Sequence, residues 1–359
     1  MCSSFRRVFV LVCTLYYFSA GAQSNGTRSQ SITSPEERIQ LGITALMRYY
    51  DRSSGLWQTE GWWNAANTTT VLGDAAAIAP RSGYTDTLQI TFTSARRRFA
   101  LFRNEFYDDE GWWALAWIQA YDVTHRQQYL EMAESIFADM SGGWDNTCGG
   151  GIWWKKDRHY KNAIANELFL SVAAHLSARH LGDRRNDYLD WAKREWTWFD
   201  NSGMINDHNL VNDGLTPECK NNGRTTWTYN QGVLIGGLVE LSTVTGDPGL
   251  KREAKLIAKA AIAKLTDTNQ VLHDRTEPNC SADTAQFKGI FVRNLVALEK
   301  AAHDDNYVKF IRANADSIWN TARTEDNEFA CRWSGPARAD GAAASSSALD
   351  TLVAAAALP

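Results

Sequence analysis

Three acidic residues and two tryptophans stand together in the segment NEFYDDEGWWALAW, residues 104–117. Asp108, Asp109 and Glu110 are consecutive, and Trp112 and Trp113 follow almost at once. Neighbouring carboxylates repel one another, and a ring packed beside a carboxyl group shields it from water. Both effects raise the pKa of a carboxyl group. One acid of the pair would then stay protonated at a pH where the other is ionised, as the cleavage of a glycosidic bond requires.

A structural role accounts for only one of these acids. An Asp in front of a helix often caps the free amide N–H groups of the first turn, where the helix dipole also favours negative charge. That leaves the second acid without a role. Retaining glycosidases hold the nucleophile and the acid/base about 5–5.5 Å apart. Consecutive residues in a bent loop-to-helix turn can meet that distance, whereas in a strand they would face opposite sides.

Four segments repeat one pattern, in which an apolar-periodic helix ends, a short turn forms around an Asp, and another helix begins. The marking acids recur at intervals of 61, 64 and 57 residues, at Asp122, Asp183, Asp247 and Asp304. A period of this kind indicates stacked helical hairpins. Counting outwards predicts twelve helices, over residues 36–50, 62–79, 84–100, 109–123, 127–140, 162–180, 184–201, 227–244, 247–265, 283–303, 305–323 and 340–357.

Twelve helices suit an all-α fold, an (α/α)6 barrel of six hairpins closed into a ring, which forms a single domain over residues 23–359. A linear solenoid of the same hairpins is the alternative. The connections that precede the even-numbered helices are mostly long, and alternate connections emerge at one end of the array. Ten of the fifteen tryptophans lie in or beside these loops, at positions 57, 62, 63, 112, 113, 144, 153, 154, 227 and 333. Long loops on a rigid scaffold commonly carry function.

The first 22 residues read as a signal peptide, with Arg6 and Arg7 before an apolar run and small residues at positions 20–22. We expect a secreted protein without a membrane span. Loss of the two arginines shifts the formal charge from −4 to −6, which makes nucleic acid an unsuitable partner. A monomer is expected. Asn25 and Asn279 fit the glycosylation pattern; Asn67 fits it too, but within a predicted helix.

Four cysteines remain after the signal peptide, one in each of four long loops: Cys148, Cys219, Cys280 and Cys331. An even number in an oxidising compartment predicts two disulfides. Because neighbouring loops lie side by side in a ring, Cys148–Cys219 and Cys280–Cys331 are the expected pairs, although sequence alone leaves other connectivities open.

Other motifs give weaker signals. No HExxH pair occurs among the seven histidines, and no set of residues has the spacing of a metal site. Gly149–Gly151 lack the Gly-Lys-Ser/Thr of a phosphate loop, and we expect them to let Trp153 and Trp154 approach a ligand. The segment 206–213 lacks the order of a calcium loop and is interpreted as an ordinary loop.

Five motifs, taken in order, resemble glycoside hydrolase family 76, the α-1,6-mannanases, including fungal secreted members. They are GWWNAANTTTVLGD (61–74), FYDDEGWWALAW (106–117), GGGIWWKK (149–156), KNAIANELFL (161–170) and TYNQGVLIGGL (228–238). The resemblance covers nearly all of the mature chain and implies an (α/α)6 barrel. It also implies cleavage of α-1,6-mannosidic bonds with retention, with Asp108 as nucleophile, Asp109 as general acid/base, and no metal or organic cofactor.

The remaining residues of these motifs are expected to line a sugar-binding groove. Tryptophans would stack on sugar faces, and polar side chains would bond mannose hydroxyls. Local capping and helix packing are the structural alternatives for each of them. The candidates are Trp62, Trp63, Asn64, Asn67, Asp74, Trp112, Trp113, Trp154, Asn162, Asn166, Tyr229, Asn230 and Gln231.

Three functions are compatible with these residues. The preferred one is a secreted endo-acting mannan hydrolase. The same pair would also serve a transglycosidase acting on cell-wall mannan or on the glycan of glycosylphosphatidylinositol anchors. The C-terminal segment, which contains Asp350, reads as a last barrel helix rather than an anchor signal. A non-catalytic glycan-binding protein would explain the tryptophans but not the adjacent acids.

Overall fold

A computed structural model describes Met1 and residues 33–80 and 82–359. Residues 34–359 form one compact unit. The predicted signal peptide beyond Met1, and Asn25, lie outside the described residues. No helix in the described part of the chain combines the length and apolar character that a bilayer crossing needs.

Twelve α-helices make up almost all of the regular structure in the described residues. They are α1 (Pro35–Leu46), α2 (Trp62–Ile78), α3 (Tyr84–Arg98), α4 (Tyr107–Thr124), α5 (Gln127–Ser141), α6 (Ala163–Arg179), α7 (Gly182–Asn201), α8 (Thr228–Thr245), α9 (Pro248–Lys264), α10 (Ala282–Ala301), α11 (Asp305–Ser317) and α12 (Gly341–Ala356). One two-stranded antiparallel sheet, β1 (Tyr50–Asp51) and β2 (Leu56–Trp57), lies between α1 and α2.

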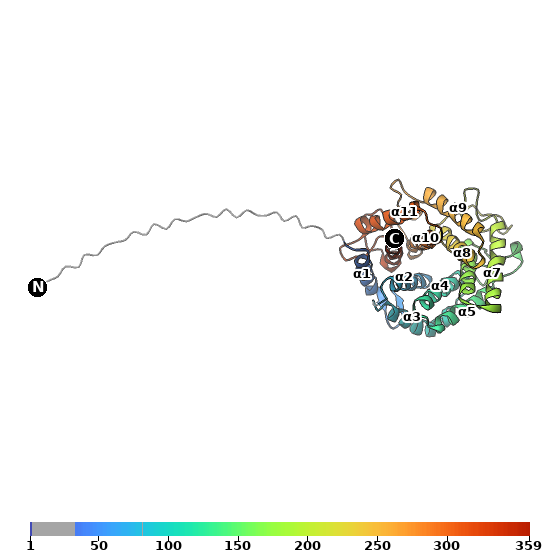
Figure 1. The fold of residues 1–359 in the computed structure, drawn as a ribbon, viewed down its shortest axis with the longest axis horizontal. Coiled ribbons are helices and arrows are strands. Elements are labelled where there is room, and N and C mark those ends of the chain that lie inside the picture. Colours follow the sequence, from blue (N-terminus) through green and yellow to red (C-terminus); the bar gives the residue numbers. More distant parts are fainter. Residues whose placement is uncertain (2–32, 81) are drawn as a thin grey trace. The chain divides into compact units, whose positions relative to one another are not determined.

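The even-numbered helices form a closed inner ring. Each packs against the next, from α2 through α4, α6, α8 and α10 to α12, and α12 packs against α2. The odd-numbered helices lie outside, as Figure 1 shows for α1, α3, α5, α7, α9 and α11 around α2, α4, α8 and α10. The predicted (α/α)6 barrel is thus confirmed, and the contact between α12 and α2 excludes a linear solenoid.

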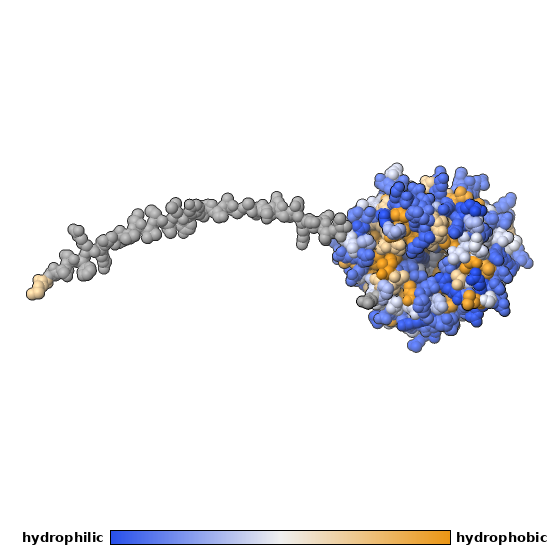
Figure 2. Space-filling model, in the orientation of Figure 1, coloured by the Kyte–Doolittle hydropathy of each residue, from blue (hydrophilic) through white to orange (hydrophobic). Residues whose placement is uncertain are grey.

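The composition of the inner helices explains why they form the inner ring. Nearly every residue of α6 and α8 is buried, and neither helix has a marked polar face. Glycines bring the backbones close together: a Cβ on Gly232 would lie 2.5 Å from the Phe291 Cα, and one on Gly289 would lie 2.6 Å from the Ser347 Cα. Outer helices such as α11 are amphipathic, with one face toward solvent. Figure 2 shows a largely hydrophilic face, hollowed inside the ring.

The marking aspartates do not share one structural role. Asp247 and Asp304 are N-caps, accepting hydrogen bonds from the backbone N–H groups of Gly249 (2.7 Å) and Asn306 (2.9 Å). Asp183 lies within the first turn of α7. Asp122 lies near the end of α4 and forms an ion pair with Arg179 instead of marking a turn. The repeat was therefore predicted correctly although its markers are not equivalent.

Both predicted disulfides are present, Cys148–Cys219 and Cys280–Cys331, and they confirm the expected pairing of neighbouring loops. A buried lysine accompanies the first of them. The Lys161 ammonium donates to the carbonyl oxygens of Thr147 (2.7 Å) and Gly150 (2.6 Å), on either side of Cys148. The lysine therefore fixes the loop before α6 from inside.

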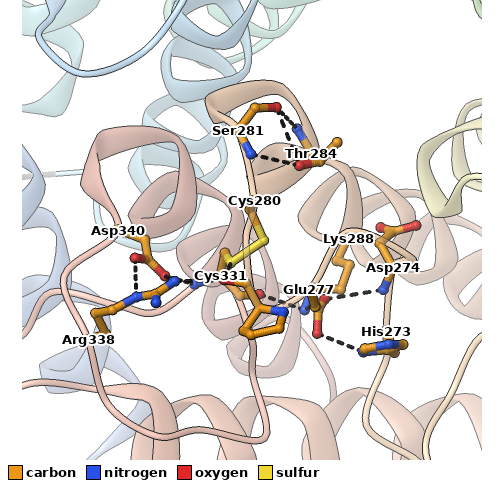
Figure 3. The surroundings of a disulfide bond; sticks show 11 residues. His273, Asp274, Glu277, Cys280, Ser281, Thr284, Lys288, Cys331, Arg338 and Asp340 are labelled. Atoms are coloured by element: carbon orange, nitrogen blue, oxygen red, sulfur yellow. Dashed lines mark hydrogen bonds and ion pairs between the residues drawn. A yellow bond between two sulfur atoms is a disulfide. The ribbon is translucent and has the colours of Figure 1, made fainter.

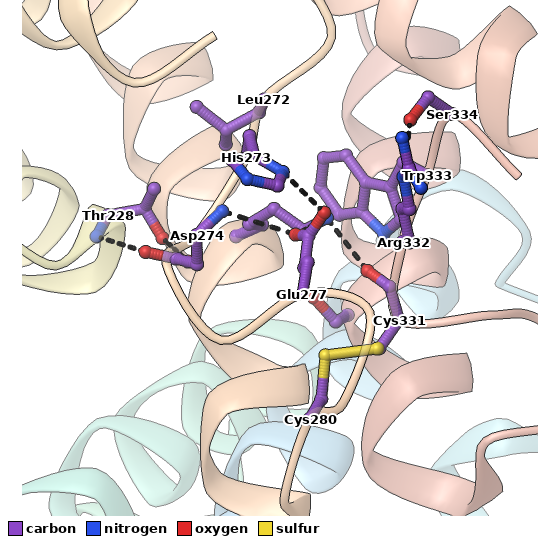
Figure 4. A network of polar contacts seen from close by, with 12 residues as sticks. Thr228, Leu272, His273, Asp274, Glu277, Cys280, Cys331, Arg332, Trp333 and Ser334 are labelled. Carbon is purple, nitrogen blue, oxygen red and sulfur yellow. Dashed lines mark hydrogen bonds and ion pairs between the residues drawn. A yellow bond between two sulfur atoms is a disulfide. The ribbon is translucent and has the colours of Figure 1, made fainter. Parts of the chain in front are cut away.

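A second buried lysine, Lys288 of α10, holds the loops beside Cys280–Cys331. Its ammonium forms an ion pair with Glu277 and donates to the Cys331 carbonyl (2.7 Å), as Figure 3 shows. Glu277 also accepts from the backbone N–H of Asp274 (3.2 Å), whose carboxylate accepts from the Thr228 hydroxyl (2.6 Å) at the start of α8 (Figure 4). One polar network thus joins the loops around the disulfide to the starts of α8 and α10.

We expect Lys288→Met to lower the free energy of unfolding by about 3–5 kcal/mol, because removing one partner leaves a buried charge uncompensated. Lys288 and Glu277 side chains are 1% and 2% exposed. Urea unfolding followed by circular dichroism measures the change. The control Lys259→Met alters an exposed lysine of α9 and should stay within about 0.5 kcal/mol of the natural chain. Equal stabilities for the two variants would contradict the role given to this network.

Candidate active site

A cavity of about 550 Å³ opens where the inner helices begin. First-turn residues of α2, α4, α8 and α10 line it, together with the loops before α6 and α8. Because the inner helices run parallel, their N-terminal ends converge on one rim, and the dipole of each favours negative charge there. The lining residues are Trp63, Phe106, Asp108, Asp109, Trp112, Trp154, Tyr160, Asn162, Asp213, Arg224, Tyr229, Asp283 and Phe287.

Four aromatic side chains from four inner helices contact one another in a closed circle within this cavity. Trp63 stacks on Trp112 (5.5 Å between centroids), and Trp112 on Tyr229 (6.4 Å). Tyr229 stacks on Phe287 (4.0 Å), which returns to Trp63 (6.1 Å). We call these four residues the aromatic floor. Flat apolar rings of this kind offer a stacking surface for a sugar or another flat ligand.

Asp108 lies inside the first turn of α4 and is not the cap of the helix. The N-cap is Phe106, two residues earlier than the predicted helix would place it. One carboxylate oxygen, Oδ2, accepts from the indole N–H of Trp154 (2.9 Å). The other, Oδ1, is buried and has no hydrogen-bond partner among the described residues. The accessible area of this oxygen is below 1 Å², so neighbouring side chains must shift before a ligand can reach it.

Asp109 is held from the opposite side. Its Oδ2 accepts from the side-chain amide of Asn104 (2.5 Å), which in turn accepts from the backbone N–H of Phe106 (2.8 Å). Burial raises the pKa of Asp109 to about 6, and the nearby Asp283 carboxylate acts in the same direction, whereas the Asn104 donor lowers this pKa. Asp109 would thus retain a proton well above the pH at which an exposed Asp loses it.

The pair shares its electrostatics. Burial raises the pKa of Asp108 well above its ordinary value, and the charge of Asp109 adds to this effect, while the Trp154 donor opposes it. Burial alone would thus put the proton on Asp108. When Asp109 is protonated, however, its repulsion disappears, and the Trp154 indole then favours the ionised form of Asp108. The geometry thus favours a state in which Asp108 and Asp109 together hold one proton.

Glu110, the third acid of the segment, points away from the cavity. It is fully buried and forms an ion pair with Lys156 (2.7 Å), which also contacts Asp139 (2.6 Å). Burial raises the pKa of Glu110 to about 8, and Lys156 opposes this. The backbone beside Lys156 pairs with the start of α4: the Tyr107 N–H donates to the Trp154 carbonyl (2.9 Å). Glu110 therefore fixes the loop that carries Trp154.

Six lining residues were not predicted from sequence: Phe106, Tyr160, Asp213, Arg224, Asp283 and Phe287. Asp283 could have been predicted, because it opens an inner helix as Asp108 and Asp109 do. In the structure it accepts from the Trp63 indole N–H (2.7 Å). Asp213 accepts from the Tyr160 hydroxyl (2.6 Å). It lies at the end of the segment 206–213, which contributes to the cavity wall through this residue.

Seven predicted site residues line the cavity: Trp63, Asp108, Asp109, Trp112, Trp154, Asn162 and Tyr229. Asn162 also caps α6, accepting from the Ala165 backbone N–H (3.3 Å). For all seven, contact with a substrate stays a prediction. The other eight predicted residues do not line this cavity.

Two of those eight are amides that hold loops in place. Asn166 accepts from the Ile152 N–H (2.7 Å) and donates to the Ile152 carbonyl (3.0 Å). Gln231 makes the same pair of bonds with Val211 (2.8 and 3.0 Å). Each side chain is fully buried, so the predicted contact with mannose hydroxyls is corrected to a clamp on the loop backbone.

Asn64 and Asn67 are likewise used within the fold. Asn64 accepts from the Gly61 N–H (3.0 Å) and donates to the Ala282 carbonyl (3.2 Å), so it joins the starts of α2 and α10. Asn67 accepts from the Arg293 guanidinium (2.7 Å). Asn230 is completely buried, and its side-chain atoms have no hydrogen-bond partner among the described residues. None of the three reaches the cavity.

Two tryptophans and one acid also need correction. Trp113 is fully buried and packs on Trp62 (4.7 Å) and Phe102 (4.8 Å), so both tryptophans belong to the packing between α2 and α4. Asp74 lies in the second half of α2, where it accepts from Gln119 (2.6 Å) in a different cavity. Along a helix, every third or fourth residue shares a face, and sequence alone did not show which face met the cavity.

Gly150 and Gly151 serve packing, a Cβ on Gly149 would meet no atom within 4 Å, and none of the three glycines lines the cavity. A Cβ on Gly151 would lie 2.4 Å from the Trp198 ring, and Gly150 and Gly151 have φ angles of +150° and +81°. Trp153, which follows, donates its indole N–H to Asp145 (2.7 Å) and does not line the cavity. The glycines let the loop lie flat on Trp198, which places Trp154 over Asp108.

Solved structures share this barrel. The α-1,6-mannanase of Salegentibacter sp. HEL1_6, with two consecutive aspartates replaced in an inactive variant bound to α-1,6-mannotetrose, matches with a TM-score of 0.80 and 23% identity, over 90% of this chain and 99% of that one. Dfg5 from Chaetomium thermophilum, in complex with glucosamine, matches with a TM-score of 0.80 and 19% identity, over 92% of each chain. These likenesses establish the fold.

The barrel and its acid pair define the class of this protein, a glycosidase. The model of glycosyl hydrolase family 76 matches residues 36–358, so the chain belongs to this family. A mannan endo-1,6-alpha-mannosidase of Eremothecium gossypii is 26% identical over 86% of this chain and 75% of its own length. A second mannan endo-1,6-alpha-mannosidase, from Candida glabrata, is 30% identical over 52% of this chain, and the matched part covers 45% of that relative.

We expect Asn166→Leu to expose the Ile152 backbone to hydrogen exchange, because two buried backbone groups lose their partners. Each unpaired group costs about 1–3 kcal/mol. Hydrogen–deuterium exchange of the peptide that contains Ile152 measures the local effect. Asn201→Ala is the control, since Asn201 bonds one backbone carbonyl from an exposed position on α7 and should leave this peptide protected. Unchanged protection in Asn166→Leu would contradict the clamp.

Proposed function

We propose that the chain is a secreted, retaining endo-α-1,6-mannosidase that hydrolyses mannan. The observation that carries this proposal is the placement of two consecutive carboxyl groups, Asp108 and Asp109, in one partly buried cavity above the aromatic floor. The two named relatives are mannan endo-1,6-alpha-mannosidases. The Salegentibacter mannanase with two consecutive aspartates replaced is described as inactive, which supports the same role here.

The proposed reaction divides the work between the two acids. The Asp108 carboxylate, which lines the cavity, attacks the anomeric carbon and forms a covalent glycosyl ester. Asp109 donates its proton to the departing glycosidic oxygen and then takes one from the water that hydrolyses the ester. The Trp154 indole N–H stabilises the Asp108 carboxylate before the attack, and the charge of Asp283 helps to keep Asp109 protonated.

The cavity suits a neutral sugar chain. Its aromatic floor offers faces for stacking, and Asp213, Asp283 and Arg224 at its walls offer partners for hydroxyl groups. A volume of about 550 Å³ lies within the range of about 300–1,000 Å³ that is usual for small-ligand sites. Its opening among loops at the rim fits a polymeric substrate, since neighbouring residues of a chain can extend beyond the cavity.

Secretion is part of the proposal. Two disulfides join rim loops, and such bonds form and persist in oxidising compartments. The expected signal peptide at residues 1–22 agrees with export.

We expect Asp109→Asn to reduce kcat/KM on linear α-1,6-mannan by about 10²–10⁴-fold, the usual contribution of a general acid/base. Asp108→Asn should lose at least as much, because no covalent intermediate can form. Sizing and quantifying the released oligosaccharides measures both. The control Asp86→Asn alters an exposed aspartate of α3 and should retain full activity. Full turnover in both site variants would overturn the assignment.

Product size separates the remaining alternatives. Hydrolysis gives shortened oligomers, whereas a transglycosidase would also form chains longer than the mannan oligomer supplied. A glycan-binding protein would bind mannan without any turnover, and its affinity would be indifferent to Asp108→Asn and Asp109→Asn.

Activity should fall as pH rises past the pKa of Asp109, because the general acid must carry a proton. Asn104→Ala removes a donor that favours ionised Asp109, so its pKa rises and the alkaline limb of kcat/KM should move to higher pH. Asp283→Asn removes a repelling charge, so the pKa falls and the limb should move to lower pH. Opposite shifts are the expected result, and a common direction would contradict the assignment of Asp109.

A further inference from the structure

An exposed asparagine in the loop before α10 has the sequence context of an N-linked glycosylation site. Asn279-Cys280-Ser281 is one of three Asn-X-Ser/Thr segments of the chain, and the other two begin at Asn25 and Asn67. Asn279 lies at the end of a turn, where its backbone N–H donates to the Thr276 carbonyl (2.9 Å). Its side-chain amide is exposed and makes no hydrogen bond within the part of the chain that the structure describes. This amide nitrogen is therefore open to modification.

Asn67 is in the opposite situation. It is 1% exposed and lies in the first half of α2. Its side-chain amide accepts from the Arg293 guanidinium (2.7 Å) and donates to the Trp63 carbonyl (3.3 Å). An oligosaccharide is bulky and hydrophilic, so it belongs on a protein surface. Of the two segments that the structure describes, only the one at Asn279 has room for a glycan.

Asn279 lies close to the catalytic rim without forming part of the cavity. It is four residues before Asp283, which lines the cavity, so their Cα atoms are at most about 14 Å apart. Asn279 itself does not line the cavity. Arg275 and Pro278 in the same turn are exposed as well, which leaves space for an attached group. A glycan on Asn279 would therefore stand on the surface beside the rim.

In the folded loop, the rest of this segment is held in other contacts. Cys280, the middle residue, is joined to Cys331, which is 1% exposed. The pattern requires a hydroxyl at the third position. That hydroxyl, Ser281 Oγ, already accepts from the Thr284 N–H (3.3 Å), and the Ser281 N–H donates to the Thr284 hydroxyl (3.0 Å), as Figure 3 shows. A glycosylating enzyme that must recognise this hydroxyl therefore finds it occupied once α10 has formed.

The order of synthesis leaves time before the loop closes. Cys331 follows Cys280 by 51 residues. At about 5–20 residues per second, the ribosome needs about 3–10 s to add a stretch of this length. During that interval Cys280 has no partner for the disulfide of the folded chain. The acceptor segment is thus available before its final partners exist.

We propose that Asn279 carries an N-linked oligosaccharide, attached before Cys280 pairs with Cys331. The proposal rests on the secretion proposed above. In the transfer, Asn279 Nδ2 forms a bond to the anomeric carbon of an N-acetylglucosamine that ends a lipid-diphosphate-linked oligosaccharide. The bond between that carbon and the diphosphate oxygen breaks, Nδ2 gives up one proton, and the lipid diphosphate leaves.

Mass spectrometry of the full chain, expressed in a eukaryotic host with its natural N-terminus, tests the site. The tryptic peptide 276–288 contains Asn279 as its sole asparagine. At least half of this peptide should carry a glycan that a peptide N-glycosidase removes, whereas the peptide with Asn67 should be unmodified. Asn279→Gln and Ser281→Ala should abolish the modification, and Ser281→Thr, which keeps the hydroxyl, should retain it. Asn279→Gln should keep kcat/KM on α-1,6-mannotetrose within about twofold, because Asn279 does not line the cavity.

A second experiment tests the order of events. Chain made without glycosylation, with both disulfides formed, is incubated with microsomal transferase and lipid-diphosphate-linked oligosaccharide, beside the synthetic peptide 276–288. The peptide should be modified and the folded chain should not. Modification of the folded chain to the same extent would contradict attachment before the disulfide.

The place where the chain is recovered separates this proposal from the secretion on which it rests. Chain in the medium with Asn279 unmodified would overturn the glycan and leave secretion standing. A glycan on Asn279 of chain that stays inside the cell would support the glycan and contradict secretion. Unmodified chain that stays inside the cell would contradict both.

Discussion

Burying two neighbouring carboxyl groups at the start of one helix is the constraint around which the rim of this barrel is arranged. Asp108 and Asp109 would repel each other if both were ionised in a site of low polarity. The first turn of α4 and the Trp154 and Asn104 donors make one negative charge tolerable there. A second charge remains unfavourable, so the pair keeps a proton, and that proton is what acid-assisted bond cleavage needs.

The surrounding loops hold this arrangement by polar contacts made from inside the barrel. Buried Lys161 and Lys288 bond loop carbonyls beside the two disulfides, while Asn166 and Gln231 each clamp one loop residue by both backbone groups. These loops bury apolar side chains such as Ile152, Val211 and Trp333, and the polar contacts tie their backbones to the inner helices. The ion pair between Lys156 and Glu110 likewise holds the loop that carries Trp154 in place.

The architecture and the acid pair could be predicted from the residues alone because both depend on local patterns. The hairpin repeat predicted the barrel. Asp108 and Asp109 are consecutive, so they are neighbours whatever fold the chain adopts. The direction in which a side chain points cannot be predicted from such a local pattern. Asn166 and Gln231 have the chemistry of sugar ligands but face loop backbone, and Trp113 lies one residue from Trp112 yet packs in the core. Phe287 belongs to the aromatic floor, where it stacks on Tyr229, although no sequence motif indicated it.

The protonation of the pair can be measured directly by carbon-13 NMR of labelled aspartate carboxyl groups during a pH titration, with Asp108→Asn and Asp109→Asn to assign the signals. The account predicts that both carboxyls titrate well above the ordinary value of about 3.9, and that replacing either one lowers the midpoint of the other. Independent titration of both near that ordinary value would contradict it.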